Sequence, residues 1–173
     1  GFSCVESGPW SLRYESLEVF VSVDFDGMYS YELGCSIGRF DNFRGSSQVP
    51  FDLGEIMRSE EISIDDVRTG FQVTTPEALE KFSNQIAYLL EHYTHKFLRG
   101  DDKAFISVSN LRDQECDRYE MEQRLERARR SLDDVWREKE YVKVVEFLSP
   151  FQEWLSPSEV KKLEYARKQL TKP

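Results

Sequence analysis

The first half of this sequence lacks lysine: none precedes Lys81, and residues 1–75 hold 13 acidic and 5 basic residues, a net charge of −8. Residues 76–173 hold 19 acidic and 18 basic residues, a net charge of −1. Nucleic acid binding requires Lys and Arg to replace the counterions of the phosphates, so the composition argues against DNA or RNA as a partner. It argues equally against an anionic membrane surface. A basic protein partner would suit the acidic half, because opposite charges steer association. The alternative is that the acidity only keeps the protein soluble.

Cysteine and histidine are also scarce. Cys4, Cys35 and Cys116 are far apart in the sequence, so they predict neither a disulfide framework nor a zinc site. Their use is typical of reduced thiols in the cytoplasm, and Cys35, which lies among apolar strand positions, is expected in the core. His92 and His95 could reach one metal ion from a helix, but no third ligand is marked nearby. They predict two exposed helix residues and no metal site.

Several segments with known functions are missing. No apolar run approaches the about 18 residues of a membrane span, and no signal peptide is visible. The sequence opens on Gly1 and Phe2 without an initiator Met, so we expect a processed form or a chain without its native N-terminal residues. No phosphate-binding loop, dinucleotide fingerprint, nucleophile elbow or calcium-loop pattern occurs. The sequence therefore predicts no cofactor and no catalytic residue.

Apolar and polar residues alternate through the first forty residues, which predicts strands with one buried face. Three strands are expected near residues 10–14, 17–25 and 29–37, with a weaker one near 2–6. The apolar positions of the two longer strands are all odd-numbered, so the loop between them must have an odd length. Residues 25–27 fit as a three-residue loop with Gly27 left-handed, which would place Val23 opposite Tyr29. An even loop at Glu15 and Ser16 would connect the preceding pair of strands.

The second half has the periodicity of helices. Segments 76–100, 102–136 and 140–148 are expected to be helical, with a break of the second one near 107–110. Thr74 or Thr75 caps the first of these helices, and Ser156 starts a last one with a capping box. A short helix is expected near 52–58. The predicted fold is α+β: an antiparallel meander over residues 1–75, packed by the helices of residues 76–173 into one compact domain.

Three carboxylates, Asp24, Asp26 and Glu32, gather around the expected hairpin. Paired carboxylates can perform acid–base chemistry where burial separates their pKa values. If the polar face of the sheet is open to water, however, they are ordinary solvated side chains. We consider them as candidate binding residues, and as the site of catalysis only if the protein is an enzyme.

The loop after the last expected strand contains the second candidate site. Arg39, Phe40, Phe43 and Arg44 combine the residue types that dominate protein-binding hot spots. The alternative is that Phe40 and Phe43 pack under the sheet edge and hold the loop in place. The sequence leaves both interpretations open.

Residues 136–150 resemble part of a tetratricopeptide repeat. Tyr141 and Leu148 match the pattern of that family, whereas Lys139 stands where the glycine of the turn would be. One partial copy is visible, and a repeat array needs about three units to bury its faces. The resemblance implies a helical hairpin of this kind, with residues 163–166 in its next helix. Helices without repeat ancestry could form the same hairpin.

As a whole, the chain resembles a family of small bacterial hypothetical proteins. The resemblance rests on the segments LRYES (12–16), SYELG (30–34), TPEA (75–78), LSP (155–157) and KLEYA (162–166). It implies a bacterial cytoplasmic protein and carries no activity and no site residues.

These observations lead to a non-enzymatic protein-binding module as the first hypothesis. Its most concrete form is an immunity protein that masks a basic nuclease toxin, and an adaptor with tetratricopeptide-like helices is the second form. The competing hypothesis is an enzyme of unrecognised class that uses Asp24, Glu32 and a histidine. A deep pocket of carboxylates and a histidine would favour the enzyme, and an acidic face ringed by aromatic residues would favour the binding module. A homo-oligomer is compatible with either.

Overall fold

The computed structural model describes residues 1–40, 49–63 and 69–171. The chain divides into two compact units, Gly1–Arg112 (unit 1) and Asp113–Pro173 (unit 2).

Unit 1 contains an antiparallel sheet whose strands follow the chain in the order β1-β2-β3-β4-β5, with β6 also paired to β4. The predicted α+β class and the meander of four longer strands are confirmed, and the two shortest strands extend it. The strands are β1 (Ser3–Ser7), β2 (Ser11–Glu15), β3 (Val19–Asp26), β4 (Glu32–Arg39), β5 (Phe51–Asp52) and β6 (Phe71–Gln72).

Two of the helices begin at caps predicted from the sequence, Thr75 and Ser156, and the short helix expected near residues 52–58 begins after Asp52. The side chains of Asp52, Thr75 and Ser156 each accept a hydrogen bond from the backbone of the first turn, which satisfies a donor that the helix leaves unpaired. The predicted break near 107–110 is wrong, because α4 is continuous. The helices are α1 (Leu53–Ser59), α2 (Pro76–Tyr93), α3 (His95–Leu98), α4 (Asp102–Arg137), α5 (Tyr141–Leu148), the 3₁₀ helix η1 (Ser149–Trp154) and α6 (Pro157–Leu170).

The turn between β3 and β4 is longer than predicted. Val23 lies opposite Cys35 and not Tyr29, and the turn comprises residues 27–31. Asp26 causes this difference, because its carboxylate accepts hydrogen bonds from three backbone N–H groups of the turn, each at 3.1 Å. The odd loop length is therefore confirmed and the three-residue loop is wrong.

Gly27 serves the turn in a way that the sequence did not indicate. Tyr31 occupies the left-handed conformation, with φ 53°, whereas Gly27 has no positive φ. A Cβ atom on Gly27 would lie 2.1 Å from the ring of Trp10. The glycine therefore allows the indole ring to pack directly on the turn.

The connection between β2 and β3 has an even number of residues, as predicted. Glu15 pairs with Phe20, so this loop does not consist of Glu15 and Ser16.

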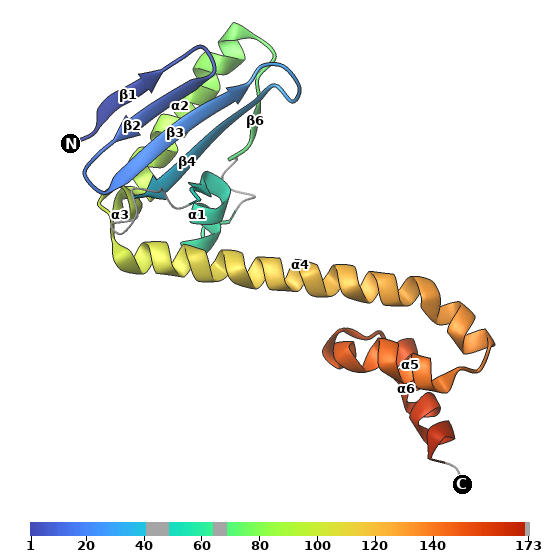
Figure 1. Cartoon of the computed structure of the whole chain (residues 1–173). Coiled ribbons are helices and arrows are strands. Elements are labelled where there is room, and N and C mark those ends of the chain that lie inside the picture. The colour runs from blue at the N-terminus through green and yellow to red at the C-terminus, as the bar shows by residue number, and fades with distance from the viewer. Residues whose placement is uncertain (41–48, 64–68, 172–173) are drawn as a thin grey trace. The chain divides into compact units, whose positions relative to one another are not determined.

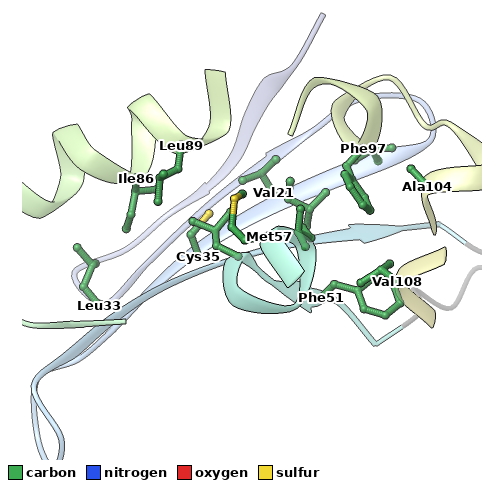
Figure 2. Close-up of a cluster of buried hydrophobic side chains, with 14 of the residues drawn as sticks. Val21, Leu33, Cys35, Phe51, Met57, Ile86, Leu89, Phe97, Ala104 and Val108 are labelled. Atoms are coloured by element: carbon green, nitrogen blue, oxygen red, sulfur yellow. The ribbon is translucent and has the colours of Figure 1, made fainter. Parts of the chain in front are cut away.

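The core of unit 1 lies between one face of the sheet and the helices. Val21, Leu33 and Cys35 point from the strands toward Ile86 and Leu89 of α2 (Figure 2). Phe97 of α3 and the first turns of α4 complete this core: Ala104, Phe105 and Val108. The helices α2 and α3 and the first part of α4 thus belong to unit 1, together with the sheet. The boundary between the two units lies within α4 and not near residue 75, where the charge composition changes.

Unit 2 is helical and has a smaller core. Leu132 and Val135 of α4 pack with Val144 and Leu148 of α5 and with Leu163 of α6. The C-terminal helical hairpin predicted from the sequence is confirmed as α5 and α6. Lys139, at the position of the expected turn glycine, has φ 59°. This backbone conformation is the one that glycine favours.

Candidate binding surface

The sheet of unit 1 has one face that no helix covers among the described residues, as Figure 1 shows. Directly opposed residues of antiparallel strands present their side chains on the same face. On the uncovered face Glu6 is opposite Arg13, Asp26 is opposite Glu32, and Asp24 is opposite Gly34. The register thus brings the three predicted carboxylates together on one surface. Its acidic residues are Glu6, Glu15, Asp24, Asp26, Glu32 and Asp52.

Short side chains separate these carboxylates. Serines and glycines occupy the intervening positions of β2, β3 and β4: Ser11, Ser22, Gly34, Ser36 and Gly38. Glu6, Asp24, Glu32 and Asp52 are exposed, and Glu15 and Asp26 are half-buried. The six carboxylates and Arg13, the one basic residue among the paired strand positions of this face, give it a strongly negative potential. We call it the acidic face.

Asp24 and Asp26 differ in electrostatic environment although both lie on β3. Partial burial and the negative charge of Glu6 raise the pKa of Asp24, and Arg13 lowers it to a smaller extent. The hydrogen bonds from the backbone of the turn and from Ser30 hold the pKa of Asp26 below its usual value. Asp26 therefore shapes the turn, whereas Asp24 is repelled by a neighbouring acid.

An aromatic platform occupies one end of the acidic face. The ring of Phe20 is 2 % exposed, because the guanidinium of Arg13 stacks above it at 3.9 Å and Phe40 packs against it at 5.4 Å. A Cβ atom on Gly38 would lie 2.1 Å from this ring. Arg13 also donates a hydrogen bond to Glu15 at 2.7 Å, so its charge is already paired within the face.

The predicted loop site is described only in part. Phe40 is half-buried against Phe20, in agreement with the interpretation that it holds the chain at the sheet edge. Arg39 is half-buried and forms ion pairs with Asp102 and Glu18. Phe43 and Arg44 lie outside the described residues. In the described part, both side chains make contacts within unit 1.

The structure contains a cleft that the sequence did not reveal. It lies at the end of the sheet beside the first turn of α2 and has a volume of about 310 Å³. Its walls are largely apolar and include Trp10, Phe25, Tyr31, Pro76 and Leu79. In the sequence, Gly8 and Pro9 before Trp10 indicate a hairpin turn. The position of the Trp10 ring at the cleft depends on its contacts with Phe25 and Gly27, which the sequence does not indicate.

The remaining candidates do not form a reactive site. Cys35 is 5 % exposed, and its burial raises the pKa of the thiol to about 12. His92 contacts the carbonyl oxygen of Tyr88 at 2.9 Å and stacks on its ring, and His95 is exposed. Within residues 1–40, 49–63 and 69–171, no group of three or more His, Cys, Asp or Glu side chains is arranged to hold a metal ion. In the same residues, no helix is both long and apolar enough to span a membrane.

No protein-family model matches the chain, and searches of curated proteins and of solved structures also find no match.

Proposed function

We propose that this protein is a non-enzymatic binding module whose acidic face docks a basic protein. One observation carries the proposal: the strand register collects six carboxylates and one arginine on a sheet face that no described helix covers. Opposite charges steer association and raise the rate of encounter. A cationic partner would also relieve the repulsion between Glu6 and Asp24, which adds to the effect of partial burial in raising the pKa of Asp24.

The same geometry supports binding over catalysis. A general acid and its partner base need different environments within reach of one substrate. Asp24 and Glu32 are exposed on the acidic face, and the hydrogen bonds of Asp26 are directed to its own turn. Both histidines lie on or next to the helical layer, since His92 is in α2 and His95 in α3. The arrangement therefore favours electrostatic docking.

The more specific form of the proposal is an immunity-type protein that masks a basic nuclease toxin in the bacterial cytoplasm. Such a role requires many carboxylates on one accessible surface, because they must compete with the phosphates that the toxin binds. An adaptor role for unit 2 is the second form. The left-handed backbone at Lys139 supports it, because the tetratricopeptide pattern places glycine there.

Binding of a short oligolysine peptide at low and moderate salt tests the proposal. We expect salt-sensitive binding to the full chain and no binding of the matching oligoglutamate. A variant with Glu6→Gln, Asp24→Asn and Glu32→Gln should bind about tenfold more weakly, since it loses three partly screened charge interactions.

The control variant removes the same number of charges from other exposed positions, with Glu80→Gln, Glu91→Gln and Glu120→Gln. It should retain nearly all of the affinity. Equal weakening in the two variants would contradict the proposal, because the attraction would then come from net charge alone.

A further inference from the structure

We infer that the cleft beside Trp10, at the end of the sheet on its helix-covered side, receives an apolar side chain, aromatic or leucine, from a basic segment of the partner that extends from the acidic face around the turn between β3 and β4. This inference rests on the proposed function and adds the feature that would give it specificity. Charge alone selects any cationic chain, whereas a pocket for one side chain selects a sequence.

The size and walls of the cleft determine the class of occupant. Its volume of about 310 Å³ is at the lower end of the roughly 300–1,000 Å³ of small-molecule sites, which suits one side chain and not a nucleotide cofactor. The walls carry Trp10, Phe25, Tyr31, Pro76 and Leu79. An aromatic or branched aliphatic group would therefore be buried among apolar atoms.

The indole wall is fixed before any ligand arrives. Trp10 packs on Phe25 with ring centroids 5.9 Å apart, and its carbonyl oxygen accepts a hydrogen bond from the Phe25 N–H at 2.8 Å. Its ring contacts Gly27 so closely that a Cβ atom would not fit. Trp10 is nevertheless 53 % exposed. A rigid aromatic surface that remains half open loses little entropy on binding.

Tyr31 supplies a second argument, because its backbone is strained. Its φ of 53° is a conformation that glycine adopts freely and that a bulky residue rarely adopts. The main chain is held there by the Tyr31 carbonyl oxygen, which accepts a hydrogen bond from the Val73 N–H at 2.7 Å. Glycine would serve the turn better, but it would remove the ring from the cleft wall. Strain of this kind is characteristic of binding sites.

The charges around the cleft select basic neighbours for the occupant. Glu77 is hydrogen-bonded to the side chain of Thr75, which lines the cleft. Asp26 and Glu32 are opposite each other at the ends of β3 and β4, on either side of the turn that contributes Gly27 and Tyr31 to the cleft. Lys81 also lies in this part of α2, and its ammonium is 5.6 Å from the centre of the Phe82 ring. These three carboxylates outnumber the single ammonium of Lys81, so Lys or Arg would be favoured on either side of an inserted side chain.

Two pentapeptides test the inference, Lys-Lys-Phe-Lys-Lys and Lys-Lys-Ala-Lys-Lys, both with blocked ends. They are titrated into the full chain with Trp136→Phe and Trp154→Phe, so that Trp10 is the one fluorophore of its kind. We expect the phenylalanine peptide to bind about tenfold or more tightly, because burial of a large apolar side chain is worth this factor. It should also shift the Trp10 emission.

Tyr31→Gly is the decisive variant. It should maintain or slightly raise thermal stability, because glycine relieves the backbone strain. It should leave the affinity for the alanine peptide unchanged and abolish the preference for phenylalanine. Tyr29→Gly is the matched control, because Tyr29 lies in the same turn, is 86 % exposed and does not line the cleft. This control should keep the preference.

The outcomes separate the inference from the proposed function. Equal, salt-sensitive binding of the two peptides, or a phenylalanine preference that survives Tyr31→Gly, would overturn the cleft and leave the acidic face intact. If the acidic-face variant binds both peptides as tightly as the unaltered chain and keeps the phenylalanine preference, the proposed role of that face is overturned and the cleft is supported. Absence of binding by both peptides at low salt would overturn both.

Discussion

Unit 1 buries 17 apolar residues in its described core, whereas the described core of unit 2 contains 6. Unit 2 adds polar contacts to its smaller core. Arg129 of α4 donates two hydrogen bonds to Glu159 at the start of α6, at 2.7 and 3.0 Å. Trp136, Tyr141 and Tyr165 of this unit form a cluster of edge-to-face rings. Unit 1 also has a partly buried ion pair, between Arg112 and Glu55. With fewer apolar residues in its core, unit 2 should depend on its charges and on the geometry of its turn for a larger share of its stability than unit 1 does.

The largest effect is expected from Phe97→Ala in unit 1. Phe97 is fully buried, and truncation of such a side chain costs about 3–5 kcal/mol. Denaturant unfolding followed by amide exchange should show faster exchange in β3 and β4 and unchanged protection in α6. Phe97→Leu is the control and should cost less than half as much. Equal loss of protection in α6 would show that the two units unfold together.

Glu159→Gln should have the next largest effect, and it should act on unit 2. Glu159 is 9 % exposed and receives hydrogen bonds from Arg129 and from its own helix cap. Loss of the charge-assisted bonds should cost about 2–3 kcal/mol. The double variant with Arg129→Met should be less destabilised than the sum of the single variants. Additive costs would mean that the pair does not act as a unit.

Acid should reproduce this effect in the unaltered protein. The hydrogen bonds from Arg129 lower the pKa of Glu159 to about 2, below the 4.5 of an ordinary glutamate. The pair therefore stabilises unit 2 fully above pH 4.5 and loses this contribution as pH falls toward about 2. We expect a loss of about 2 kcal/mol by pH 3, measured by unfolding at a series of pH values. Glu159→Gln should lack this part of the acid response.

Lys139→Gly should have the smallest effect and the opposite sign. The φ of 59° at Lys139 costs a residue with a Cβ atom about 1–2 kcal/mol. Glycine removes this cost, but part of the resulting gain in stability is offset by the greater freedom of glycine in the unfolded chain. Unit 2 should gain up to about 1 kcal/mol in thermal unfolding. Lys161→Gly, at an exposed position within α6, is the control and should lose about 1 kcal/mol. A loss in both variants would mean that the turn gains nothing from glycine.

Local signals predicted much of the fold. Alternation indicated the four longer strands, and the capping patterns at Thr75 and Ser156 located two helix starts. The capping box at Asp52 became evident only in the structure. The register of β3 with β4 could not be read from the same pattern. It depends on the carboxylate of Asp26 and on the ring of Trp10, which make a longer turn more stable than the three-residue loop. The end of α2 was also missed, because Thr94 is buried and donates to the carbonyl oxygen of Leu90.

The candidate site was predicted in part for a related reason. Asp24 and Glu32 were recognised because the parity of a strand assigns them to one face whatever the register. Asp26 was expected in the loop, and the structure places it on the same face as the last residue of β3. Glu6 and Asp52 joined them only through pairing with distant strands. The cleft combines a hairpin turn with the start of α2, and the contacts between these segments have no signature in either of them.

The edges of the sheet determine how this protein behaves among its own copies. On one side, the pairing of β1 with β2 shifts register between Cys4 and Glu6. On the other side, β5 and β6 are two residues long. Irregular, charged or very short edge strands are poor templates for another strand. Concentrated solutions should therefore resist growth into extended β-aggregates, and the broad acidic face can remain uncovered without the sheet becoming a nucleus for fibres.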